Sequence, residues 1–97
     1  NAHGGHGVIS VTSNVAPALC AQFQNASLEG HHDEARTLMD RLMPLHDALF
    51  SAPSPAPVKY AASLLGLAST EVRLPLVECP DAVKTRVRDA MKGLGLI

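Results

Sequence analysis

The chain has 97 residues, of which 46% are hydrophobic and 18% are charged, a composition typical of one small globular domain or of part of a larger one. Eight Lys and Arg residues against nine Asp and Glu residues give a formal net charge of -1, without the basic surface that binds nucleic acid or an anionic membrane. No apolar run approaches the roughly 20 residues that span a bilayer, and the polar, glycine-rich start is not a signal peptide.

The run GVISVT, residues 7–12, is the only stretch with the composition of a β-strand. Val8, Ile9 and Val11 are apolar and β-branched, and they do not alternate cleanly with polar residues. Both faces of the strand are therefore expected to be buried, as in the parallel sheet of an α/β protein. Alternatively, the run is a loop or joins a helix of a self-sufficient bundle.

Four helices are predicted after this strand. The first begins at Pro17, which suits a first helical position, and ends just before Gly30, which suits the position after a helix. The second begins near Asp33 and continues to Leu49. Its apolar stripe of period 3.6 stays in phase across Pro44, which indicates one bent helix.

A proline-rich connector over residues 51–57 leads to the remaining two helices. A short third helix is predicted from Pro57 to Gly66. After a loop, the last helix is predicted to begin near Pro80 and to continue to Gly93.

The predicted strand has no partner in this chain, because parallel partners need βα crossovers that no other segment supplies. We therefore expect the chain to self-associate or to leave residues 1–13 irregular. The chain also begins at Asn1 without Met, which suggests a truncated or processed polypeptide. Cys20 and Cys79 belong to no C-x-x-C pair and are predicted to be free thiols in a reducing cytoplasm.

Four motifs follow one another along the chain: GGHGVISVTSNVAP, RLMPLHDALF, APVKYAASLLGL and VRLPL. Their order and spacing resemble those of the dihydrodipicolinate synthase family, and the resemblance covers essentially the whole chain. The segment VTSNVAP resembles this synthase more closely than the N-acetylneuraminate lyases, which share its fold and its Schiff-base chemistry.

The resemblance implies an α/β fold of the TIM-barrel family, of which this chain would be the C-terminal third. Residues 1–30 would form the last β-strand and helix of the (β/α)8 barrel, and residues 31–97 a C-terminal helical domain. The other seven strands would lie upstream, so that the isolated chain would be mostly α-helical. Its partners would be the rest of the barrel or a second copy of the chain.

The resemblance also implies an activity for the whole protein. The family condenses pyruvate with L-aspartate-4-semialdehyde through a lysine Schiff base to give 4-hydroxy-tetrahydrodipicolinate, in lysine and diaminopimelate biosynthesis. It is usually cytoplasmic and homotetrameric, and this lyase uses no metal or nucleotide cofactor. The alternatives are another Schiff-base aldolase of the N-acetylneuraminate lyase type, or a stand-alone helical interaction module.

One substrate contact is implied within the chain, at Ile9, whose counterpart on the eighth strand lines the pyruvate site. The position is suitable because the C-terminal half of a barrel strand faces the mouth where substrates bind. The family's Schiff-base lysine and catalytic tyrosines precede this region, so the chain alone is expected to be inactive. Lys59 is expected to be structural or exposed, because a catalytic lysine needs a desolvated or cationic setting.

The histidines do not predict a metal site. His3 and His6, and likewise His31 and His32, lack further ligands at ordered spacing, and all four are expected to be solvated. His46 is expected to lie at the boundary of the apolar face of the second helix.

Two further patterns are assigned no catalytic role. Gly4, Gly5 and Gly7 precede the strand, whereas a dinucleotide-binding fingerprint follows a strand and opens a helix. The charged residues of the second helix are expected to form a solvated face or, alternatively, a contact with a neighbouring subunit. They are Arg36, Asp40, Arg41 and Asp47.

Overall fold

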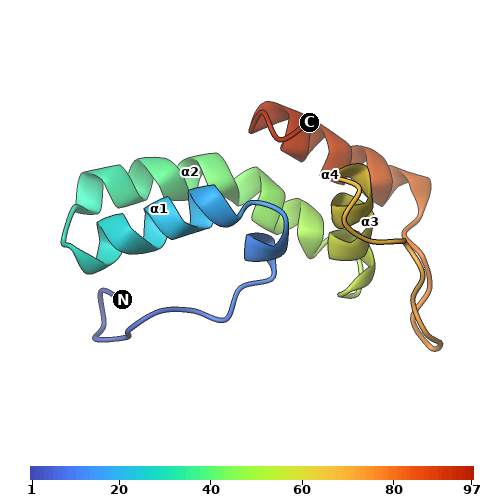
Figure 1. Ribbon diagram of the computed structural model, residues 1–97, viewed down its shortest axis with the longest axis horizontal. Helices are drawn as coiled ribbons and strands as arrows, with labels where there is room; N and C mark the ends of the chain where they lie inside the picture. The colour runs from blue at the N-terminus through green and yellow to red at the C-terminus, as the bar shows by residue number, and fades with distance from the viewer.

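A computed structural model describes residues 1–97, and its regular structure is entirely helical. The elements are the 3₁₀ helix η1 (Thr12–Asn14) and the α-helices α1 (Pro17–Leu28), α2 (His32–Leu49), α3 (Ala56–Leu64) and α4 (Asp81–Gly93). Helices α1 and α2 form an antiparallel hairpin, and α3 and α4 pack around the C-terminal half of α2 (Figure 1). All four predicted helices are confirmed. None of them combines the length and the apolar composition needed to cross a membrane.

The predicted strand over residues 7–12 is wrong for this chain. Residues 5–11 have no regular secondary structure, and Thr12 begins η1 instead. The backbone of residues 5–10 makes no hydrogen bond with another backbone group. A strand exists only as part of a ladder, and no other segment of these residues supplies one. The expectation that this segment is irregular without its sheet is confirmed for residues 5–11.

Local signals in the sequence set the two ends of α1. Pro17 occupies its first turn, where the missing N–H group would have no helical partner anyway. Gly30 ends the helix with a φ of 78°, a value that glycine adopts without strain. The N–H of His31 then donates to the carbonyl of Ala26 at 2.8 Å and the N–H of Gly30 to that of Ser27 at 3.3 Å, which satisfies the last turn of the helix.

Helix α2 supplies the longest apolar face of the molecule. Its buried residues recur at helical spacing and are Ala35, Leu38, Leu42, Leu45, Ala48 and Leu49. The helix continues through Pro44, although a proline inside a helix removes one backbone hydrogen bond and costs about 3 kcal/mol. Burial of several leucine side chains, each contributing roughly 1.5–3 kcal/mol, offsets this cost.

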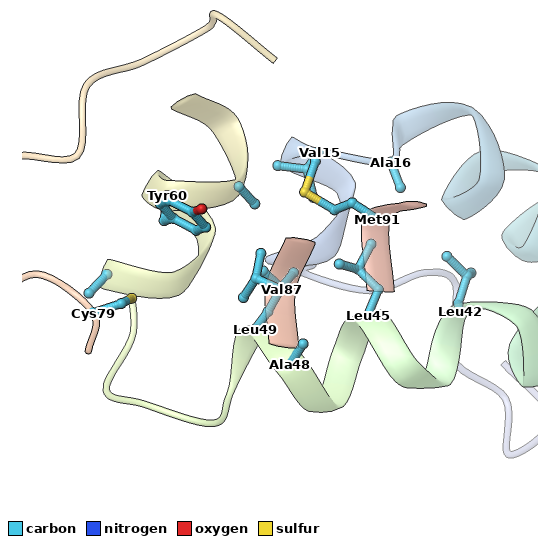
Figure 2. Close-up of a cluster of buried hydrophobic side chains, with 12 residues drawn as sticks. Val15, Ala16, Leu42, Leu45, Ala48, Leu49, Tyr60, Cys79, Val87 and Met91 are labelled. Carbon is cyan, nitrogen blue, oxygen red and sulfur yellow. The ribbon is translucent and has the colours of Figure 1, made fainter. Parts of the chain in front are cut away.

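The main core lies where α2 meets α4, α3 and the segment before α1. Leu45 and Leu49 of α2 and Val87 and Met91 of α4 are fully buried. Val15 belongs to the same buried cluster, so the segment after η1 takes part in the core (Figure 2). A smaller cluster joins α1 to the first half of α2. The position of the N-terminal turn is therefore determined by the same core that holds the helices.

Helices α3 and α4 are also joined by polar contacts on Tyr60, which is 7% exposed. Arg88 Nη2 donates to the hydroxyl oxygen of Tyr60 at 2.6 Å. The ammonium group of Lys84 lies 5.5 Å from the centroid of the same ring, within the range of a cation–π interaction. Tyr60 thus links the two helices through both its polar and its aromatic parts.

Candidate functional site

The candidate functional site is the N-terminal segment around Ile9, the residue with a predicted substrate contact. Ile9 is fully exposed to solvent, and Val8 is 64% exposed. Both are β-branched and apolar, and both lie on a stretch of backbone whose N–H and C=O groups have no backbone partner. Apolar side chains on an unpaired, extended backbone form a surface that favours pairing with another strand.

Directly after Ile9 the chain enters a tightly hydrogen-bonded turn. The N–H of Ser13 donates to Ser10 Oγ at 3.1 Å, and Ser13 Oγ donates to the carbonyl of Ser10 at 2.9 Å. Asn14 Nδ2 donates to the carbonyl of Val11 at 2.9 Å. Ser and Asn side chains that bond to nearby backbone groups stabilise turns. Ser10, which follows Ile9, is consequently held in place, although Ile9 itself is fully exposed.

A long-range hydrogen bond anchors this turn to α2. Thr12 Oγ1 lies 2.6 Å from His46 Nδ1, across 34 residues of sequence. Thr12 is 2% exposed. His46 is half-buried, so the Thr12 end of the bond lies in a region with little water, where the loss of a hydrogen bond is more costly.

A pocket of about 170 Å³ lies between the N-terminal segment and the α1–α2 hairpin. Val8, Cys20 and His46 are among the residues that line it. Burial raises the pKa of the Cys20 thiol above its ordinary value, and a hydrogen bond with Ser10 opposes part of this change. The thiol is thus predominantly protonated at neutral pH, and a protonated thiol is a poor nucleophile.

Lys59 has a structural contact. It lies in the first turn of α3, and its ammonium group donates to the main-chain carbonyl of Glu71. This hydrogen bond attaches the loop between α3 and α4 to the start of α3. The contact agrees with the structural role expected for Lys59.

The histidine pairs lie on the surface, as predicted. His3 and His6 are exposed in the N-terminal segment. His31 Nδ1 lies 3.5 Å from a carboxylate oxygen of Glu29 and 3.7 Å from one of Glu34, and these exposed pairs contribute little to stability. No group of three His, Cys, Asp or Glu side chains is placed to hold a metal ion.

The charged residues of α2 are exposed, as predicted for a solvated face. Asp40 and Asp47 border an open groove of about 580 Å³ between α2 and α4, opposite Arg86 and Asp89. Arg36 points elsewhere, with its guanidinium 3.5 Å from Asp33.

Sequence reasoning missed the pairing of Thr12 with His46. The sequence pattern indicates Thr12 only as a β-branched strand residue, and His46 only as a residue at the boundary of an apolar face. No local pattern reveals the bond, because its two partners are 34 residues apart. The signal that the sequence does contain is a polar residue, Thr12, at the end of an apolar run.

Comparisons with known proteins all match this chain to one enzyme family. The sequence model of the dihydrodipicolinate synthetase family matches residues 2–94. The 4-hydroxy-tetrahydrodipicolinate synthase of Parvibaculum lavamentivorans is 60% identical over 97 residues, which cover 100% of this chain and 33% of that protein. This chain therefore spans about a third of the length of the curated relatives that it matches.

Two solved structures have the same shape over this length. Dihydrodipicolinate synthase from Thermotoga maritima is 38% identical with a TM-score of 0.95, over 99% of this chain and 32% of that one. The chloride-inhibited dihydrodipicolinate synthase from Acinetobacter baumannii, complexed with pyruvate, is 35% identical with a TM-score of 0.92. That match covers 97% of this chain and 32% of the other. The irregular N-terminal segment is largely included in both matches.

Proposed function

The chain belongs to the dihydrodipicolinate synthetase family, and we propose that its 97 residues form the C-terminal third of a 4-hydroxy-tetrahydrodipicolinate synthase. The fold class is that of the TIM-barrel enzymes, although the regular structure of these 97 residues by themselves is entirely helical. The whole enzyme condenses pyruvate with L-aspartate-4-semialdehyde through a lysine Schiff base. The 60% identity to the Parvibaculum lavamentivorans synthase over every residue of this chain supports this reaction.

The observation that carries the proposal is the unpaired backbone of residues 5–10. In the proposed enzyme, residues 1–30 supply the last strand and helix of the barrel, and residues 31–97 form the C-terminal helical domain. Neighbouring barrel strands would then pair with the free N–H and C=O groups and cover the apolar side chains beside them. The TM-score of 0.95 to a synthase about three times as long supports this arrangement.

Ile9 is proposed to form an apolar wall of the pyruvate site. Ile9 lies near the C-terminal end of the unpaired segment 5–10, and TIM-barrel enzymes bind their substrates at the C-terminal ends of the barrel strands. An apolar wall excludes water, and charges in a site with little water interact more strongly. The nucleophilic lysine is proposed to lie outside these 97 residues. The pyruvate complex of the Acinetobacter baumannii synthase supports pyruvate as the substrate.

The cellular setting follows from the same proposal. The enzyme would act in lysine and diaminopimelate biosynthesis in the cytoplasm, as a homotetramer. The exposed charged face of α2, with Asp40 and Arg41, would be available to a neighbouring subunit. The synthase names of the relatives favour this enzyme over an N-acetylneuraminate lyase, and the match over the whole chain disfavours a stand-alone helical module.

A hybrid enzyme tests the proposed function. In the hybrid, this chain replaces the 97 matched residues of the Parvibaculum lavamentivorans synthase. We expect the hybrid to condense pyruvate with L-aspartate-4-semialdehyde and to form a pyruvate adduct that borohydride reduces to a stable product. The 97-residue chain alone is the control, and we expect it to form no adduct. A folded hybrid without activity, or an adduct on Lys59 of the control, would contradict the proposal.

A further inference from the structure

We propose that His46 is a positioning residue for the pyruvate site: it holds Thr12, and thereby fixes the place of Ile9. Helix α2 of the helical domain would then contribute to pyruvate affinity without touching the substrate. The inference rests on the proposed function, because Ile9 has a substrate role only in the whole enzyme.

The first link is the bond between the two side chains. His46 Nδ1 lies 2.6 Å from Thr12 Oγ1, and Thr12 is 2% exposed. A hydroxyl can donate to an imidazole nitrogen or accept from it, so the bond is available to either tautomer of the ring. If His46 is replaced by an apolar residue, the buried hydroxyl of Thr12 is left without this partner, whereas His46 is half-buried.

The backbone carbonyl of Thr12 also holds the start of α1 in place. This carbonyl accepts the N–H groups of Val15 at 3.0 Å and of Ala16 at 2.9 Å, immediately before α1 begins. Val15 and Ala16 are buried in the main core. Thr12 therefore connects the N-terminal segment with α1 through its backbone and with α2 through its side chain.

The second link leads from Thr12 to Ile9. Two hydrogen bonds between Ser10 and Ser13 close the turn around Thr12. Ile9 immediately precedes this turn, so the turn sets where the segment that carries Ile9 leaves α1 and α2, while barrel strands would pair with its backbone in the whole enzyme. His46 holds the turn against α2 through Thr12. If this bond is lost, the turn can shift, and we expect Ile9, which directly precedes the turn, to shift with it. Small displacements in a substrate site have large effects on the reaction.

The comparison with a complete synthase supports the use of this geometry for the whole enzyme. The Thermotoga maritima synthase matches 99% of this chain with a TM-score of 0.95, so the segment, the turn and α2 have a similar mutual arrangement there. The bond between Thr12 and His46 spans the segment and the helix within that matched region.

Steady-state kinetics of the hybrid enzyme test the inference. Thr12→Val and His46→Leu each remove the bond, whereas Thr12→Ser keeps the hydroxyl and His46→Asn keeps a polar atom near the position of Nδ1. We expect the first two to raise the KM for pyruvate about fivefold, the equivalent of one hydrogen bond, and to change the KM for L-aspartate-4-semialdehyde less than twofold. The conservative variants should retain the pyruvate KM of the unmodified hybrid.

Two controls separate positioning from a general loss of structure. His32→Leu changes an exposed histidine on the same helix and should leave both KM values unchanged. The double variant Thr12→Val/His46→Leu should raise the pyruvate KM no further than either single variant, because both remove one bond. Thr12→Val replaces a hydroxyl by a methyl group of similar size, so it decides the question if His46→Leu fails to fold.

The inference is overturned if folded Thr12→Val has an unchanged pyruvate KM, or if both KM values rise together. It is also overturned if His46→Asn and Thr12→Ser are as impaired as the apolar variants. An inactive unmodified hybrid would instead contradict the proposed function. The failures of the two proposals are therefore distinguishable.

Discussion

The side chain of Ile9 is fully exposed, whereas that of Thr12, three residues later, is 2% exposed and bonded to α2. The boundary between an anchored and an unanchored part of the chain lies between these two residues. On the anchored side, the turn is held by side-chain bonds and by the main core. On the other side, an apolar segment has a backbone without partners. The proposed function accounts for this contrast, because the segment would pair with barrel strands of the whole enzyme.

Ile9→Asp should have different effects in two settings. In the 97-residue chain, the residue is fully exposed, and we expect the free energy of unfolding to change by no more than about 0.5 kcal/mol. In the hybrid enzyme, the new carboxylate would repel the carboxylate of pyruvate, and the KM for pyruvate should rise about tenfold or more. Ile9→Val keeps the apolar wall and is the matched control. An equal pyruvate KM in all three proteins would refute the assignment of Ile9.

Gly30→Ala should destabilise the chain by about 1 kcal/mol, because an alanine at a φ of 78° is strained. The matched control is Gly93→Ala at the end of α4, where φ is ordinary and the added methyl group would meet no atom within 4 Å outside its chain neighbours and the nearby helix backbone. That change should stabilise the chain by about 0.5 kcal/mol. Urea unfolding of both variants measures the two effects. Changes of the same sign would show that the end of α1 does not depend on this glycine.

Tyr60→Phe should lower the free energy of unfolding by about 0.5–1 kcal/mol, since it removes the hydroxyl that accepts from Arg88. The ring remains, so its contact with Lys84 is unchanged. A double-mutant cycle with Arg88→Ala isolates the bond: the Tyr60→Phe change should have almost no effect once Arg88 is absent. Fully additive effects would mean that the hydroxyl acts through other neighbours.

The two thiols should make stability depend on pH in the alkaline range. Burial raises the pKa of Cys79, partly opposed by Lys84, and burial also raises the pKa of Cys20. The folded chain therefore holds these protons more tightly than the unfolded chain. Their contribution to stability is complete below about pH 8.5 and is lost as the pH rises beyond it.

The comparison with a variant lacking both thiols isolates this effect from other groups that titrate in the same range. We expect the free energy of unfolding to fall more steeply between pH 8 and pH 10 in the unmodified chain than in Cys20→Ala/Cys79→Ala. Between pH 6 and pH 7.5, the difference between the two proteins should be constant. Parallel curves up to pH 10 would contradict the raised pKa values.

The helices could be predicted from the sequence because their signals are local. Pro17 and Gly30 mark the ends of α1, and both act within one turn of the chain. The apolar stripe of α2 extends in phase from Leu38 to Leu49, and the structure buries both of these residues. Local conformational preference and burial agree for these elements, and such agreement makes a prediction reliable.

The N-terminal segment and the site could not be predicted in the same way. A β-strand depends on a partner, and the apolar run around Ile9 has none among these residues, so its composition did not determine its conformation. The bond between Thr12 and His46 depends on the packing of α2 against η1, which brings together residues far apart in the sequence. Chemistry that arises from tertiary contacts has no local signature.

Amide hydrogen exchange at Val8 and Ile9 tests the central claim most directly, namely that this segment pairs with strands outside these 97 residues. In the chain alone, both amides lack a backbone partner and should exchange as fast as in an unstructured peptide. In the folded hybrid enzyme, the same two amides should be strongly protected. Fast exchange in the active hybrid, or protection in the isolated monomeric chain, would contradict the claim.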